Sequence, residues 1–276
     1  MAEATTLLPQ LLPQLLPLAG LTFLLGLRHG MDPDHLAVVD NLTRYNAGKA
    51  PGRARWCGLF FSLGHGAMVT LVAALLALAA SARQIPPWVE TAGNLISIGF
   101  LFAIGILNLM TLARTPAHQS AVPRGLRSGL APGLMRRATE VSHPALISLI
   151  GAGFAISMDT MSQAAVFSLA ASGEFAWGVA ILLGLIFTFG MLLVDAANGL
   201  WVYRLINGAG ANAIWSHRLT LTIGLLSLAI ALFGLLRLAN QHLDHWYDAH
   251  TLQLGISTMV LLAAVYLIGK IRRVAP

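Results

Sequence analysis

Charged residues and cysteine are both scarce in this chain of 276 residues. Charged residues make up 10% of the chain and hydrophobic residues 57%, whereas an ordinary soluble domain has about 25% charged residues. This balance excludes an ordinary soluble fold and predicts an integral membrane protein. The single cysteine, Cys57, excludes a disulfide framework and a thiolate-rich zinc or iron–sulfur site. A bound metal would therefore need imidazole, carboxylate or backbone ligands.

Motifs typical of several enzyme classes are also missing. The chain has no GxxxxGK[ST] phosphate-binding loop and no HExxH pattern of the kind found in zinc proteases. A diiron oxidase would need more histidine and glutamate close together than the apolar segments contain. We therefore expect a protein that is not an enzyme and has no resident cofactor, and no ATPase partner is evident.

Apolar segments recur along the whole chain, which leaves no room for a separate soluble domain. A helix that crosses a bilayer needs about 20 predominantly apolar residues. We expect one all-α integral membrane domain over residues 1–276. The sequence predicts about seven transmembrane helices, at residues 17 to 40, 56 to 80, 88 to 112, 144 to 170, 175 to 203, 215 to 237 and 252 to 271.

Basic residues give the chain a net charge of +6 and a pI near 10.2. They lie in short connections and form no polar face, so nucleic acid is not an expected partner. Fourteen of the 17 fall on one side of the predicted spans, and the other side has only Arg83 and Arg237. The positive-inside rule then places the N-terminus outside and the C-terminus inside. We expect a multi-pass protein of the cell inner membrane with a basic cytoplasmic loop at 113–143.

The first predicted span holds a dense cluster of ionisable residues. Each such residue at membrane depth costs about 2.5 to 3.5 kcal/mol on insertion scales, so a cluster indicates a function. The run GLRHGMDPDHLAVVDN places Arg28, His29, Asp32, Asp34 and His35 within eight positions. Two imidazoles with one or two carboxylates suit nickel, cobalt, zinc, copper or iron better than magnesium or calcium. The cluster therefore predicts a site for a divalent transition metal.

A break in the first helix is expected inside this cluster. Pro33 disturbs the hydrogen bonding of the preceding turn, and Gly30 lies only three residues before it. Such a break would free carbonyl groups and bring Asp34 toward the two imidazoles.

The second span offers a further imidazole, in the run FFSLGHGAMV. His65 lies between Gly64 and Gly66, and small neighbours of this kind allow another helix to approach closely. We expect His65 to complete the metal site from a second helix. The alternative is a plain hydrogen bond between two helices.

Later spans carry polar residues at helical spacing, which indicates either a helix interface or a cation path. Asp159 on the fourth span and Asp195 and Asn198 on the fifth are candidates for metal support, because metal-bound imidazoles commonly donate their other N–H to a carboxylate. Arg28 is expected to pair with Asp32, Asp159 or Asp195 and so to lower the charge of the empty site.

The last external connection is rich in polar residues. We expect these to be solvated loop residues, although weak collection of metal ions is the alternative. They are His242, Asp244, His245, Asp248 and His250.

The first two motifs resemble those of the nickel/cobalt transporters often called NiCoT. The run RHGMDPDHLAVVDN is similar to the signature H-x4-D-H of that family, here His29, Asp34 and His35, and FFSLGHGAMV resembles its second motif around His65. The resemblance covers about residues 20 to 205. Family members usually have eight spans with the signature in the second, so this chain resembles a version that lacks the usual first helix.

The third and fourth motifs depart from the family pattern. Gln163 and Asn198 stand where the family usually has acidic residues. The residues kept are Met158, Asp159 and Thr160 in the third motif, and Gly190, Met191, Asp195 and Gly199 in the fourth.

The resemblance implies a permease that imports nickel or cobalt ions into the cytoplasm. It also implies that the ion is bound by His29, Asp34, His35 and His65, with the metal as substrate and the lipid bilayer as surroundings. Two alternatives remain open. One is an exporter of the same metals, and the other is an integral membrane metalloenzyme.

Overall fold

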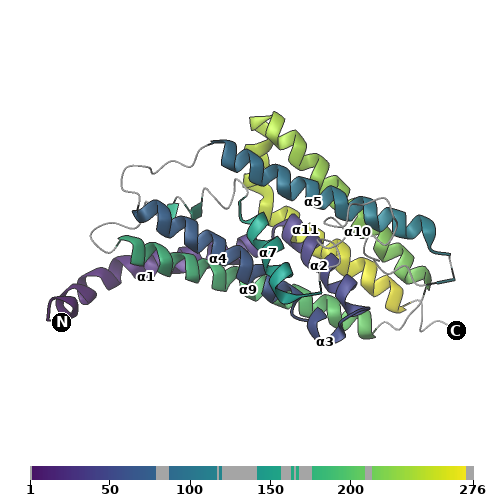
Figure 1. Ribbon diagram of the computed structural model, residues 1–276, viewed down its shortest axis with the longest axis horizontal. Helices are drawn as coiled ribbons and strands as arrows, with labels where there is room; N and C mark the ends of the chain where they lie inside the picture. The colour runs from purple at the N-terminus through teal and green to yellow at the C-terminus, as the bar shows by residue number, and fades with distance from the viewer. Residues whose placement is uncertain are drawn as a thin grey trace.

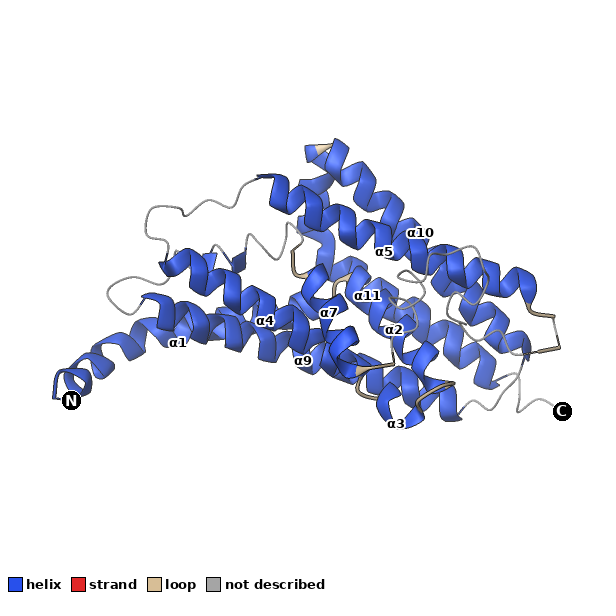
Figure 2. Ribbon diagram, viewed as in Figure 1, coloured by secondary structure: helices blue, strands red, loops and turns tan. Residues whose placement is uncertain are grey.

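The computed structural model describes residues 2–78, 87–116, 118–119, 142–156, 163–164, 166–167, 176–208 and 213–271. Within these ranges the regular elements are all helices and no strand occurs (Figure 2). The prediction of an all-α protein is therefore confirmed. The helices are α1 (Ala2–Gly30), α2 (Pro33–Ala47), α3 (Pro51–Ala54), α4 (Cys57–Leu78), α5 (Pro87–Arg114), α7 (Pro144–Phe154), α9 (Ala176–Gly208), α10 (Ala213–Ala239) and α11 (Gln241–Ile271).

The first predicted span is two helices with a sharp turn between them. Helix α1 ends at Gly30, where the amides of Met31 and Asp32 donate to the carbonyls of Arg28 and His29 at 3.0 Å each. Helix α2 then starts with Pro33 in its first turn, where a missing N–H costs little. The break expected from the glycine and the proline is confirmed, and the predicted span from 17 to 40 is divided between α1 and α2.

Helix α2 lies at the centre of the molecule. On one side α9 packs against α1 and α4, and α4 also packs against α7. On the other side α10 packs against α5 and α11, and α2 contacts α4, α5, α9, α10 and α11 (Figure 1). A helix surrounded in this way is buried along most of its length, so its polar side chains must find partners inside the protein.

Five of the described helices are long and apolar enough to cross a membrane. They overlap the predicted spans at 56 to 80, 88 to 112, 175 to 203, 215 to 237 and 252 to 271. The predicted span at 144 to 170 begins as the shorter apolar helix α7, and most of its remainder lies outside the described residues. The count of seven spans stays a prediction.

Several basic helix ends lie together at one end of the molecule. Helix α1 begins at the opposite end from the one at which α11 ends (Figure 1). Near the end of α2, Arg44 donates to the Thr220 hydroxyl of α10 at 2.6 Å, and His217 of α10 lies 3.1 Å from the Thr115 carbonyl just after α5. The orientation with the N-terminus outside stays a prediction, and most of the loop at 113–143 lies outside the described residues.

The predicted last external connection is instead helical. Helix α11 starts at Gln241, directly after Asn240, and its first turns carry the polar residues that we expected in a loop. Trp246 and Tyr247 pack their rings against Phe233 of α10, with centroid distances of 6.1 and 5.8 Å. The apolar residues at helical spacing within this polar segment explain the helix.

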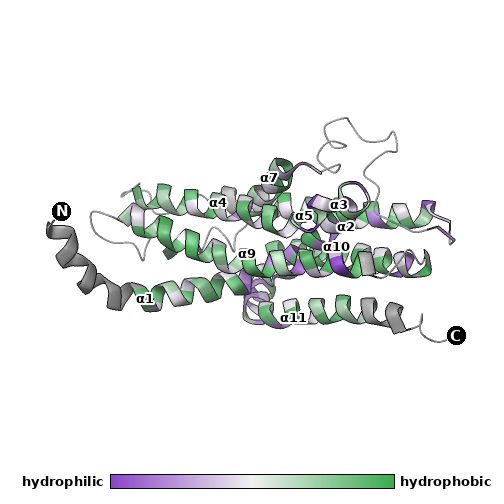
Figure 3. Ribbon diagram, turned by 90° about the horizontal axis from the view of Figure 1, so that it is seen from below, coloured by the Kyte–Doolittle hydropathy of each residue, from purple (hydrophilic) through white to green (hydrophobic). Residues whose placement is uncertain are grey.

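Hydrophobic side chains cover much of the outer surface of the long helices. Exposed leucines lie along α4, α9 and α10, among them Leu75, Leu182 and Leu225. Hydrophilic residues gather in the middle of the molecule, where α1 ends and α11 begins (Figure 3). This distribution is the one that a lipid surrounding favours, with polar groups kept inside the bundle.

Candidate metal centre

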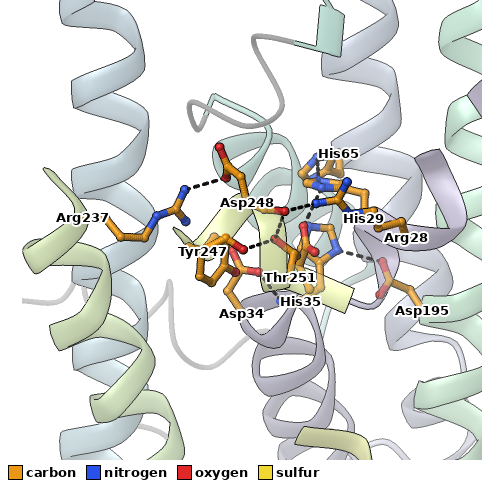
Figure 4. Close-up of polar contacts among 11 residues, drawn as sticks. Arg28, His29, Asp34, His35, His65, Asp195, Arg237, Tyr247, Asp248 and Thr251 are labelled. Atoms are coloured by element: carbon orange, nitrogen blue, oxygen red, sulfur yellow. Dashed lines mark hydrogen bonds and ion pairs between the residues drawn. The ribbon is translucent and has the colours of Figure 1, made fainter. Parts of the chain in front are cut away.

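Three histidines from three helices meet near the centre of the bundle. His29 comes from the last turn of α1, His35 from the first turn of α2 and His65 from the middle of α4. Their ring centroids are 4.6 Å apart for His29 and His35, 5.0 Å for His29 and His65, and 4.8 Å for His35 and His65. The sharp turn between α1 and α2 is what lets two histidines from one stretch of chain face a third (Figure 4).

The spacing of the ring nitrogens is compatible with one shared metal ion. One ligand nitrogen from each histidine lies within 4.8 Å of the other two. The Nε2 atoms of His29 and His65 are 3.2 Å apart. Two imidazole nitrogens bound at about 2.0 to 2.1 Å to the same ion are separated by about 3 Å when they occupy neighbouring positions.

The histidines are enclosed by the protein. Their exposed fractions are 4% for His29, 1% for His35 and 0% for His65. Phe187 of α9 lies against His29 with a centroid distance of 5.4 Å, and Phe61 of α4 lies against His35 at 5.0 Å. Apolar walls of this kind exclude water and strengthen the electrostatic interactions inside the site.

Carboxylates hold the Nδ1 side of two of the imidazoles. His29 Nδ1 is 2.8 Å from Asp32 Oδ2, and His35 Nδ1 is 3.2 Å from Asp195 Oδ2. The Ser62 hydroxyl donates to the same Asp195 oxygen at 2.7 Å. An imidazole that donates Nδ1–H to a carboxylate keeps the lone pair of Nε2 for a metal ion. Both Nε2 atoms are therefore suited to be ligands.

Replacing Asp195 by asparagine is expected to weaken metal binding about 10- to 100-fold, the usual effect of losing an outer partner of a ligand histidine. The amide keeps the size of the carboxylate and an oxygen that accepts from His35 Nδ1, but it loses the negative charge that strengthens this hydrogen bond. Equilibrium binding of nickel to purified protein measures the effect. Arg218→Gln, at an exposed residue of α10, provides the control and should keep the affinity. An affinity of Asp195→Asn equal to that of the control would contradict a role for Asp195 in orienting His35.

Asp34 does not join the three histidines. Among the described residues, the group whose ligand atoms lie within 4.8 Å of one another holds His29, His35 and His65. The Asp34 Oδ1 atom instead accepts the backbone N–H of His35 at 2.9 Å, and the residue lines a cavity next to the site. Because successive residues of a helix point about 100° apart, Asp34 and His35 face different sides of α2.

The other predicted support residues are spread around the site. Arg28 donates to the backbone carbonyl of Asp248 at 2.5 Å, while Asp32 bonds to His29. Asn198 is buried on α9, and its amide nitrogen has no hydrogen-bond partner in the described part of the chain. Asp159 lies outside the described residues.

Sequence reasoning missed two features of the site. It gave no role in the site to Ser62, whose hydroxyl donates to Asp195. It also placed Asp248 in a loop, whereas the first turns of α11 lie against Arg28. The spacing of three between Ser62 and His65 on one helix face was the available signal for the first feature.

The chain is similar to proteins named as nickel transporters. The sequence profile of the NicO family, described as high-affinity nickel-transport protein, matches residues 15–272. The chain is 31% identical over 247 residues to a high-affinity nickel transport protein of Cupriavidus necator, which covers 80% of this chain and 68% of that protein. It is 30% identical over 253 residues to the nickel transporter NixA of Staphylococcus aureus, covering 81% and 73% of the two chains.

A fungal relative is much longer. The chain is 30% identical over 217 residues to a high-affinity nickel transport protein of Cryptococcus neoformans, covering 67% of this chain and 44% of that protein. The chain thus matches less than half the length of the fungal relative. No solved structure matches the chain.

Proposed function

Because this chain belongs to the NicO family of high-affinity nickel-transport proteins, we propose that it is a permease that carries nickel or cobalt ions across the cell inner membrane into the cytoplasm. The observation that supports this proposal most directly is the trio of buried histidines at the meeting point of α1, α2 and α4. The ion is the cargo of the protein. No chemical conversion of it is needed.

The proposed ligands are the imidazoles of His29, His35 and His65. Neutral imidazole suits nickel and cobalt, and a site without thiolate is consistent with these borderline ions. The carboxylates of Asp32 and Asp195 orient two of the ligands, and their two negative charges offset the charge of a divalent ion in a dry site. This balance favours a divalent cation over a monovalent one.

Asp34 has a different proposed role from the histidines. It lines the cavity on one side, and the next residue along the chain is a proposed ligand. We infer that it receives the ion from the cavity and passes it to the histidines. Asp159 and Asn198 are proposed to line the path beyond the site, and Arg28 to hold α11 against the end of α1.

The membrane potential is sufficient to drive uptake. It supplies about 2.3 kcal/mol per charge per 100 mV, and so about 4.6 kcal/mol for a divalent ion. That energy corresponds to accumulation on the order of 10³-fold. The proposed uniporter, with its N-terminus outside and its C-terminus inside, therefore needs no ATP hydrolysis.

The direction of transport is tested with radioactive nickel in sealed vesicles of both orientations. Import predicts accumulation in right-side-out vesicles with a potential that is negative inside, and loss of that accumulation when the potential is collapsed. Accumulation confined to inside-out vesicles would show an exporter. Tightly held, non-exchangeable metal together with turnover of a lipid or peptide would show a metalloenzyme.

Replacing Asp34 by asparagine separates delivery from binding. We expect uptake at trace nickel to fall about tenfold, while the affinity of purified protein for nickel stays within about threefold of the original, because the imidazoles remain in place. Uptake in cells and equilibrium binding are the two measurements, and Arg218→Gln, a charge change at an exposed residue of α10, is the control. A loss of affinity as large as that caused by removing a histidine would instead make Asp34 a ligand.

A further inference from the structure

A cavity of about 550 Å³ lies between the start of α2 and the helices α5, α10 and α11. Asp34 lies on its wall, one residue before His35. On α10 the cavity is lined from Leu226 to Leu238, which corresponds to about 18 Å along the helix axis. At about 30 Å³ per molecule, its volume has room for more than ten waters. A divalent ion with its inner shell of water fits inside.

One wall of the cavity carries a row of polar side chains. Thr91, Asn94 and Ser97 follow each other at every third position on α5, and all three line the cavity. Ser97 is 6% exposed, and its hydroxyl has no hydrogen-bond partner among the residues described. Asp34 and Asp244 line the same cavity from α2 and α11. The walls therefore offer oxygen atoms to a hydrated cation over the length of the cavity.

An arginine closes one end of the cavity. Arg237, near the end of α10, donates through Nε to Asp244 Oδ1 at 2.8 Å, and its Nη2 lies 3.3 Å from Asp248 Oδ1. Its guanidinium also lies 3.8 Å from the ring centroid of Tyr247. The positive side chain of Arg237 is thus paired with both carboxylates of the first turns of α11, one of which, Asp244, lines the cavity.

The same turns of α11 reach the metal centre. The carbonyl of Asp248 accepts from Arg28, whose neighbour His29 is a proposed ligand. Figure 4 shows Asp248 between Arg237 and the histidines. A change in the pairing of Arg237 therefore acts on the helix segment that lies directly over the site.

We propose that this cavity is the entrance vestibule through which the cation reaches the histidines, and that Arg237 is its gate, a tethered cation that the incoming ion displaces from Asp244 and Asp248. This inference rests on the proposed transport function and adds to it the route and the residue that controls entry. The pair of Arg237 with Asp248 is partly exposed and therefore weak, so a divalent ion competes effectively for that carboxylate first and then reaches Asp244. The exposed Asp248 lies at the outer side of the pair and the less exposed Asp244 on the cavity wall.

Nickel uptake gives the first readout. In Arg237→Gln the two carboxylates lose their tethered cation, so uptake at trace nickel should rise at least threefold through a lower KM, with little change in kcat. Asp244→Asn should lower uptake at trace nickel by a similar factor. Arg218→Gln makes the same charge change at the other end of α10, on an exposed side chain, and should leave uptake unchanged.

Access to the cavity gives the second readout. The substitution Ser97→Cys is made in a Cys57→Ala protein, so that the buried native cysteine is absent. Right-side-out vesicles are then treated with a membrane-impermeant, positively charged methanethiosulfonate reagent. The cysteine should react, and Arg237→Gln should raise its rate of reaction at least threefold, whereas Arg218→Gln should not. Nickel binding to each purified variant shows that the histidine site is still folded.

The outcomes separate the two proposals. If the unmodified protein does not bind nickel, the proposed transport function itself is overturned. Nickel binding through the histidines, together with an unreactive cysteine at position 97, would overturn only the vestibule. Equal behaviour of Arg237→Gln and Arg218→Gln in either readout, or lower uptake by an Arg237→Gln protein that still binds nickel, would overturn the gate.

Discussion

Replacing His65 by alanine is expected to reduce nickel uptake at trace concentrations more than 100-fold, because removal of a ligand should cost more than the 10- to 100-fold typical of an outer partner. His65 is the only one of the three clustered histidines that comes from α4, and its Nε2 lies 3.2 Å from that of His29. Without it, the ion would keep two imidazoles from one side of the site. Two such ligands cannot replace the water that the ion gives up on entering a closed cavity.

The control for this prediction is a histidine at the far end of the bundle. His217→Ala removes an imidazole that lies beside the Thr115 carbonyl, away from the cluster, and should leave uptake within about twofold of the original. Amounts of protein in the membrane and the thermal stability of purified protein separate loss of metal binding from loss of folding. If a stable His65→Ala protein took up nickel normally at trace concentrations, the histidine cluster could not be the transport site.

Replacing Gly64 by valine is expected to prevent correct assembly of the bundle, at a cost of about 3 kcal/mol or more. A Cβ atom at this position would overlap the backbone carbonyl of Ser148 on α7, and backbone cannot move aside as a flexible side chain can. Gly151 of α7 meets the carbonyl of Phe61 in the same way. The two helices therefore touch backbone to backbone directly beside His65, so the valine should abolish both monodisperse protein and nickel binding.

Gly99 of α5 is the matched control. A Cβ atom there would have nothing within 4 Å, so Gly99→Val should give normal amounts of folded protein that binds nickel. Size-exclusion chromatography in detergent and nickel binding measure both variants. A folded Gly64→Val protein with a normal nickel site would mean that α4 and α7 do not need this close contact.

The chemistry of the site was largely predictable from local sequence. Intramembrane histidines are costly unless they serve a purpose, so His29 and His35 in one apolar span and His65 in the next indicated a shared site. The glycines beside His65 predicted a close helix contact. The structure confirms it, because α7 lies so close to Gly64 that a Cβ atom there would overlap its backbone. The break at Pro33 followed from the missing N–H of proline, an effect that acts within one turn.

The partners of the imidazoles were less predictable. Asp195 was a candidate among several, and its bond to His35 joins residues that are 160 positions apart. Asp34 was expected beside the imidazoles because the break at Gly30 and Pro33 would turn it toward them. Adjacent residues of a helix, however, point to different faces, and the face of Asp34 borders the cavity.

The amino-acid sequence by itself determined that this protein is a helical membrane protein with histidines of the kind that suit a transition-metal ion, because composition, span length and ligand type act through local chemistry. Only the tertiary structure decided that Asp195 contacts His35 and is itself held by Ser62, that Asp34 belongs to the cavity wall, and that Arg237 pairs with the first turns of α11. Periodicity tells which residues share a helix face, but the neighbour of that face depends on how all the helices pack.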